Sequence, residues 1–155
     1  MNFPAGTLTL RPCWTAHVLL EPTREQGQGP LGTRLIVPIT GGHFEGTLDP
    51  GGPAPRAFSG RVLPGGFDLQ RLRADGAKEL EAIYHMETDD GTGIEIRNHA
   101  LLTYDAEGGL AYSRSRIHVE APEGPYAWLN QRIFVGSVQV MRPQVEVLIR
   151  SFVLE

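Results

Sequence analysis

Turn signals recur so often along this chain that they leave no room for a helix of ordinary length. The 155 residues include 19 glycines and 12 prolines, a fifth of the chain, and both residue types break helices and mark turns. Between these signals, apolar and polar residues alternate with a period of two, which is typical of strands. The pattern predicts an all-β protein and argues against a helical bundle.

The alternation predicts nine or ten strands. It is clearest in two neighbouring segments, where Leu80, Ala82, Tyr84 and Met86 share one face and Ile94, Ile96, Asn98, Ala100, Leu102 and Tyr104 share another. Loops are expected at 21–32 and 49–57, a turn at 41–42, and one helical turn near 126–130. The predicted strands cover residues 8–20, 34–39, 43–48, 58–64, 67–73, 80–87, 94–104, 110–120, 133–141 and 144–153.

Strands at this spacing, joined by hairpin-type turns, favour an antiparallel sandwich or barrel. Several strands reach ten residues, and long twisted antiparallel strands close into a barrel because closure removes exposed edges. We therefore predict a single domain over 1–155, an antiparallel β-barrel of eight to ten strands with a lipocalin- or calycin-like shape. A barrel of this size can hold one small ligand.

Composition and charge exclude several classes of protein. No uncharged stretch exceeds the ten residues of 35–44, whereas a membrane span needs about 20 apolar residues. The net charge is −4 and the basic residues are scattered, which argues against nucleic-acid binding. Cys13 is the only cysteine and no secretory signal is visible, so we expect a packed thiol in a reducing, cytoplasmic compartment.

Four segments, taken in order and spacing, carry a resemblance to a known family. They are GGHFEG (41–46), GRVLPGGFDLQ (60–70), ETDDGTGIEIRN (87–98) and GPYAWLNQRIFVG (124–136). The chain resembles an uncharacterised bacterial and fungal family, domain of unknown function 3237, also catalogued as a UPF-type family, from about residue 8 to 153. The resemblance implies an antiparallel β-barrel and no general activity.

The chain departs from the family pattern next to its most distinctive aspartate. Asp68 stands where the PGGAD segment of the family has its Asp, but Phe67 replaces the Ala and Leu69 stands where the family has Trp. The 49–57 excursion is also longer than is usual in the family. We therefore do not apply the ligand specificity of any relative to this chain.

Asp68 is the first candidate for chemistry because it follows a Pro-Gly-Gly turn at the start of a strand. It either caps this turn by accepting backbone N–H bonds or serves as a general base at the barrel rim. Acting as a base would require a raised pKa, which we expect from burial under Phe67 and Trp128. Tyr84 and Asn98 lie on apolar strand faces and are expected to point inward as hydrogen-bonding groups.

Arginine and histidine side chains give further candidates with two interpretations each. Arg114 and Arg116 share a strand face that points either to solvent or, for one Arg, into the lumen to hold an anionic or enolic ligand. His85, His99 and His118 lack local metal-ligand spacing and are expected to be solvated unless three strands bring them together. The carboxylates of 87–90 fit a hairpin turn better than a cation site.

The segment 126–130 is expected to plug one end of the barrel. Trp128 would then belong to the core and Asn130 would end the turn, or Tyr126, Trp128 and Asn130 would contact a ligand. The candidate catalytic residues are thus Asp68, Tyr84 and Arg114, and the candidate substrate-binding residues are Asn98, Tyr126, Trp128 and Asn130.

Two functions remain open from the sequence. No P-loop, dinucleotide fingerprint, HExxH or nucleophile-elbow motif is present, so we expect neither a cofactor, nor a metal, nor covalent catalysis. One hypothesis is a cofactor-independent isomerase or cyclase that transfers a proton on a carbonyl or polyketide-like metabolite. The other is a non-catalytic module that binds a small hydrophobic or aromatic ligand. Apolar residues on both faces of 144–153 also predict a homodimer.

Overall fold

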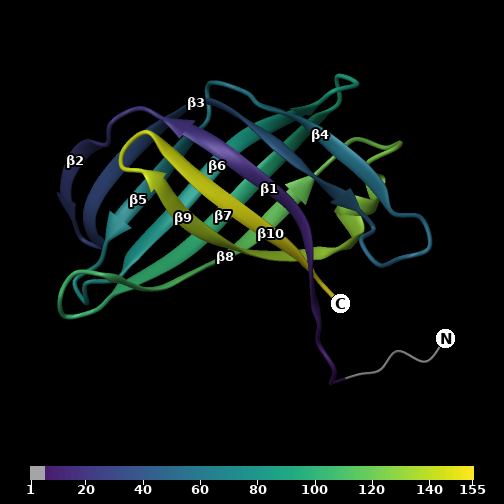
Figure 1. Cartoon of the computed structure of the whole chain (residues 1–155). Coiled ribbons are helices and arrows are strands. Elements are labelled where there is room, and N and C mark those ends of the chain that lie inside the picture. Colours follow the sequence, from purple (N-terminus) through teal and green to yellow (C-terminus); the bar gives the residue numbers. More distant parts are fainter. Residues whose placement is uncertain (1–5) are drawn as a thin grey trace.

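The computed structural model describes residues 6–155 and consists almost wholly of antiparallel strands (Figure 1). The single 3₁₀ helix in these residues is η1 (Ala127–Gln131), near the predicted helical turn. The predictions of an all-β fold and of a barrel are confirmed. The strands are β1 (Leu10–Leu20), β2 (Arg24–Gly29), β3 (Gly32–Leu48), β4 (Arg56–Val62), β5 (Phe67–Leu72), β6 (Lys78–Thr88), β7 (Gly93–Tyr104), β8 (Leu110–Glu120), β9 (Ile133–Arg142) and β10 (Glu146–Leu154).

The barrel closes through β1, which pairs with β10 on one side and with β3 on the other. From β10 the ring continues through β9, β8 and β7 to β6. The position between β6 and β3 is shared, because β5 pairs with both strands at one end and β4 with both at the other. The result is a closed eight-stranded barrel with two extra strands.

Two predictions between residues 21 and 48 were wrong. The predicted loop 21–32 contains β2, which pairs with the first part of β3. The predicted turn at Gly41-Gly42 is absent, and β3 runs as one strand of 17 residues through both glycines. Gly42 adopts a φ of 138°, so the strand bends between its β5-paired and β4-paired parts without reversing direction.

Large aromatic side chains fill the half of the interior that lies under β4 and η1. Trp14 packs edge-on against Phe134 with a centroid distance of 5.0 Å, and Phe44 lies 5.5 Å from Phe58. Leu129 of η1 is buried in the same cluster. Cys13 is also buried, which raises the pKa of its thiol to about 12. This half of the barrel is a packed core.

The apolar residues of 144–153 on which the homodimer prediction rests differ in exposure within the single chain. Leu148, one of the apolar residues behind that prediction, is 7% exposed within the single chain, whereas Val145 is 42% exposed. Part of the apolar surface is therefore covered by the chain itself, and the homodimer stays a prediction. Within residues 6–155, no helix is long and apolar enough to cross a membrane.

We expect Gly42→Ala to destabilise the barrel strongly. A Cβ atom at this position would overlap the backbone carbonyl oxygen of His17 on β1, and φ lies in a region that L-residues rarely adopt. The loss should reach about 2 kcal/mol or more, measured as the free energy of unfolding in urea. Gly93→Ala is the matched control, because its Cβ would meet open space, and equal effects of the two variants would contradict this view of the β1–β3 contact.

Candidate functional site

The half of the barrel interior away from the Trp14, Phe44, Phe58 and Phe134 cluster contains a cavity of about 140 Å³. One wall is aliphatic and comes from β1, β3, β9 and β10: Val18, Leu20, Ile39, Val138, Val140, Val147 and Ile149. The opposite wall carries the polar groups and comes from β5, β6 and β7: Asp68, Gln70, Lys78, Tyr84, Asn98 and Tyr104. The cavity therefore suits a small molecule with one polar edge and one apolar edge.

The strand register explains why the polar residues meet. Asp68 on β5 is paired with Ala82 on β6, and Ala82 is paired with Asn98 on β7. Paired residues of antiparallel strands point to the same side of the sheet, so all three face the lumen. Asp68 and Asn98 are two strands apart, about 10 Å between backbones, and only the methyl group of Ala82 lies between them. This small residue leaves space for a ligand between the two polar groups.

The two carboxylate oxygens of Asp68 differ in their hydrogen bonding. Its Oδ2 accepts a hydrogen bond of 2.7 Å from Gln70 Nε2, and its buried Oδ1 has no partner among residues 6–155. Burial raises the pKa of Asp68 to about 6, while the Gln70 bond, the charge of Lys78 and the Glu81 backbone oppose the shift. The group can therefore take up and release a proton near neutral pH.

The source of this burial differs from our expectation. Phe67 precedes Asp68 on the same strand, so its side chain lies on the opposite face of the sheet. Trp128 packs against Phe134 and does not line the cavity. The carboxyl group is desolvated instead by the barrel interior, including the aliphatic wall across the cavity.

Asn98 and Tyr84 complete the polar wall at greater depth. Asn98 is 4% exposed, and its amide oxygen has no hydrogen-bond partner within the described residues. Tyr84 is 2% exposed, and burial raises the pKa of its hydroxyl, which stays protonated at neutral pH. An amide and a neutral hydroxyl facing a cavity are hydrogen-bonding groups available to a ligand.

Sequence reasoning missed Lys78 and Gln70. Both residues follow from the same alternation that identified their neighbours, because Lys78 shares a face with Tyr84 and Gln70 shares a face with Asp68. Lys78 is also the only lysine in a chain whose other 13 basic residues are Arg. A polar residue at the end of an otherwise apolar strand face could have identified both residues as facing the cavity.

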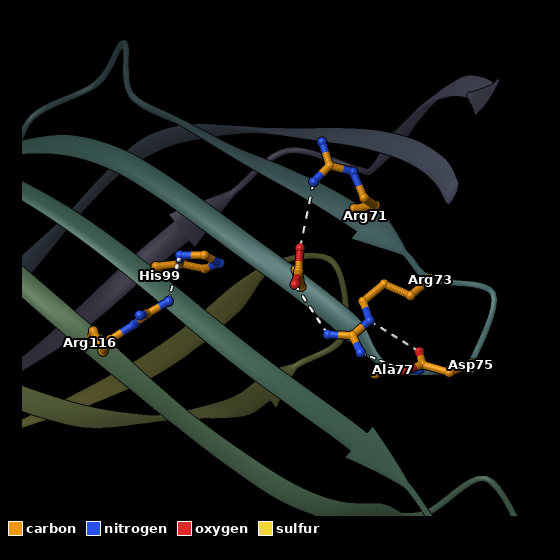
Figure 2. Close-up of polar contacts among 7 residues, drawn as sticks. Arg71, Arg73, Asp75, Ala77, His99 and Arg116 are labelled. Carbon is orange, nitrogen blue, oxygen red and sulfur yellow. Dashed lines mark hydrogen bonds and ion pairs between the residues drawn. The ribbon is translucent and has the colours of Figure 1, made fainter. Parts of the chain in front are cut away.

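The arginines and histidines of the sequence analysis lie on the outer surface. Arg114 is exposed on β8, where its guanidinium lies 5.8 Å from the Tyr112 ring centroid and donates to the Ser113 carbonyl. Figure 2 shows Arg116 turned toward His99, with 3.2 Å between Arg116 Nη2 and His99 Nδ1. Glu79 on β6 forms ion pairs with Arg71 and Arg73. Arg114 is therefore not brought together with Asp68, Tyr84 and Asn98.

The 126–130 segment serves the structure at the other end of the barrel. The Tyr126 hydroxyl donates to Asp90 Oδ2 at 3.1 Å, which ties the segment to the 89–91 turn. Asn130 holds both backbone polar groups of Ala121, its amide accepting from the N–H and donating to the carbonyl, each at 2.8 Å. Neither residue, nor Trp128, lines the cavity, and within residues 6–155 no group of His, Cys, Asp and Glu side chains is arranged to hold a metal ion.

We expect Asn130→Ala to lower stability without weakening ligand binding in the cavity. The variant leaves the N–H and carbonyl of Ala121 without their partner, a loss of about 1–2 kcal/mol in the free energy of unfolding. Gln131→Ala, the exposed neighbour, is the control and should change stability by less than about 0.5 kcal/mol. A large loss of ligand affinity at unchanged stability would instead give Asn130 the binding role considered from the sequence.

Comparison with known proteins places the chain among relatives of similar length. A family model described as protein of unknown function (DUF3237) matches residues 8–154. A UPF0311 protein of Rhodopseudomonas palustris is 32% identical over 143 residues, covering 84% of this chain and 88% of the relative. The PR-toxin biosynthesis cluster protein 7 of Penicillium roqueforti is 28% identical over 143 residues and covers 74% of each chain.

Solved structures agree with the barrel. A protein of unknown function from Rhodopseudomonas palustris superposes with a TM-score of 0.83 at 30% identity, covering 97% of this chain and 100% of the other. An enzyme from Penicillium herquei has a TM-score of 0.72 at 20% identity over the full length of both chains, which is a likeness of fold. The family match, the identity and the shared barrel together show that the chain belongs to the DUF3237 family.

Proposed function

We propose that this protein is a cofactor-independent enzyme that transfers a proton on a small carbonyl compound inside the barrel, as an isomerase or cyclase does. One observation carries the proposal. Asp68 lines the cavity, one of its carboxylate oxygens is buried without a hydrogen-bond partner among residues 6–155, and its pKa of about 6 lies close to neutrality. General bases are most effective when their pKa lies near the working pH.

The hydrogen bond from Gln70 gives this carboxyl group a defined orientation. With Oδ2 held by the amide, Oδ1 is the atom left to accept a proton from a compound in the cavity. After the transfer, the protonated group can return the proton to another atom of the same compound. Such a sequence of removal and return is the chemistry of an isomerisation, and it needs no electron acceptor.

The rest of the polar wall suits the oxyanion that develops when a carbonyl compound loses an α-proton. The Asn98 amide and the Tyr84 hydroxyl face the cavity from β7 and β6 and can donate hydrogen bonds to that oxygen. The aliphatic wall from β1, β3, β9 and β10 limits the access of water, which strengthens these interactions. Arg114, which lies outside the barrel, has no part in this scheme.

The names of two similar fungal proteins favour a catalytic role over simple ligand binding. The Penicillium herquei protein of the same fold is named an enzyme, and the Penicillium roqueforti relative is named for a toxin biosynthesis cluster. Small-molecule biosynthesis supplies enolisable carbonyl compounds as intermediates. A non-catalytic binding module would use the same cavity, but it would not need a titrating carboxyl group there.

Hydrogen–deuterium exchange at carbon tests the proposal without knowledge of the natural substrate. The protein is incubated in D₂O with a panel of small enolisable ketones and β-dicarbonyl compounds, and deuterium uptake is followed by mass spectrometry. We expect accelerated uptake for at least one compound, with rates that rise with pH through a midpoint near 6, because the base must be deprotonated. Asp68→Asn should reduce the rate by at least about 100-fold.

The control is Arg114→Met, which removes a cation from the outer face and should leave the rate unchanged. Exchange at equal rates in the wild-type protein and Asp68→Asn would remove Asp68 as the base. Binding of panel compounds without any accelerated exchange would establish the binding module in place of the enzyme.

A further inference from the structure

Among residues 6–155, Lys78 is the only cation that lines the cavity, and no direct contact with a carboxylate neutralises its charge. It is the first residue of β6 and points to the same side as Leu80, Ala82 and Tyr84. Within residues 6–155, no carboxylate oxygen lies within ion-pair distance of its ammonium group, whereas Arg71 and Arg73, from the neighbouring β5 and the turn after it, both pair with Glu79. A half-buried ammonium without a contact partner is available to a ligand.

Lys78 and Asp68 affect each other across the cavity. Partial burial lowers the pKa of Lys78, and the negative charge of Asp68 opposes this shift. The positive charge of Lys78 in turn lowers the pKa of Asp68 against the larger effect of burial. The other titratable groups of the lining are the hydroxyls of Tyr84 and Tyr104, whose pKa values are both raised, so they remain neutral.

Charge balance in this cavity restricts the ligand. The empty site holds one carboxylate and one ammonium, which sum to zero. A ligand that is always anionic would add an uncompensated negative charge next to Asp68 in a largely aliphatic cavity, which is costly unless Asp68 first takes up a proton from solvent. A ligand that brings its own acidic proton avoids this cost, because the proton can move to Asp68 while the resulting oxyanion faces Lys78.

Size restricts the ligand further. The cavity of about 140 Å³ is close to the roughly 150 Å³ of an apolar protein cavity that accepts benzene. The buried part of a ligand is therefore about one ring, with its apolar edge against the wall formed by β9 and β10. The polar edge then faces Asp68, Asn98 and Lys78.

We propose that the substrate is a ring-sized acidic hydroxy or β-dicarbonyl compound, a phenol or an enol, and that Lys78 binds its oxyanion. This inference rests on the proposed function and adds the class of substrate and the residue that selects it. The proton of the compound moves to Asp68 Oδ1, the electron pair stays on the ligand oxygen, and the ammonium of Lys78 faces that oxygen. The total charge of the site is unchanged by the transfer.

The probe is 4-nitrophenol, whose ionised form has its own visible absorption band, and the neutral comparison is 4-nitrotoluene. Binding is measured at a pH about one unit below the pKa of free nitrophenol, where most of the free compound is protonated. We expect the bound compound to show the phenolate band and to bind at least about tenfold more tightly than 4-nitrotoluene. Lys78→Met and Lys78→Gln should each remove the band and the tenfold preference.

Two control variants separate the effect of the positive charge at residue 78 from the effect of substitution as such. Lys78→Arg should retain most of the phenolate band, and Arg114→Met on the outer face should retain all of it. Equal binding of the two probes, failure of both to bind, or a phenolate band that survives in both neutral Lys78 variants would overturn the proposal.

Asp68→Asn distinguishes this inference from the proposed function. Without the carboxylate there is no repulsion of the phenolate, so the band should persist or strengthen, with the proton released to solvent. Loss of carbon exchange with retention of the band supports both proposals. If Asp68→Asn retains carbon exchange, the assignment of Asp68 as the base is contradicted, and the assignment of Lys78 is not. If Asp68→Asn loses the phenolate band, the assignment of the oxyanion to Lys78 is contradicted.

Discussion

The pairing of β1 with both β10 and β3 is the constraint on which the rest of this structure depends. It joins the first strand to the last and leaves the ring without a free edge, so the inward faces of all strands enclose one interior. Alternation then assigns every second residue to that interior. Because β3 must pair with β1, β4 and β5 along its length, it runs as a single bent strand through Gly41 and Gly42.

The two halves of the interior have different contents and different roles. Aromatic side chains such as Trp14, Phe58 and Phe134 fill one half to close packing. Smaller aliphatic residues line the other half, and Ala82 and Ala100 leave the space that forms the cavity. The pairing of β5, β6 and β7 holds Asp68 and Asn98 two strands apart, and the proposed function depends on this spacing.

The cavity carries a cost in stability that a purely structural interior would avoid. The pKa of Asp68 is about 6 in the folded protein and lower in the unfolded chain, so the unfolded state loses this proton first as pH rises. The free energy of unfolding therefore falls as pH rises from about 4 to about 6, by on the order of 2–3 kcal/mol in total. Below this range Asp68 is protonated in both states and does not lower stability. A buried carboxyl with a free oxygen is typical of a functional site, where stability is given up for activity.

The sequence alone was sufficient for the barrel and for three of the residues on its polar wall. Period-two alternation predicted that Tyr84 and Asn98 point inward, and the turn before Asp68 drew attention to that residue. Alternation separates the two faces of a strand without saying which one points inward, so Arg114 was kept as a candidate although its face is the outer one. Register was not accessible from one sequence, because the partner of each strand depends on closure, so Asn130 was grouped with residues at another place in the barrel. Lys78 was missed because a lone charged residue at the end of an apolar face resembles a solvated strand end.

Titration of the Asp68 carboxyl group in the unliganded protein tests directly whether a buried base lies in the barrel. Carbon-13 labelling of the aspartates, with Asp68→Asn to assign the signal, allows its chemical shift to be followed against pH. We expect a midpoint near pH 6, and a further rise in Lys78→Met, where the ammonium charge that opposes the burial effect is absent. A midpoint near 4 that is unchanged in Lys78→Met would show a solvated carboxylate and contradict a buried base in the barrel.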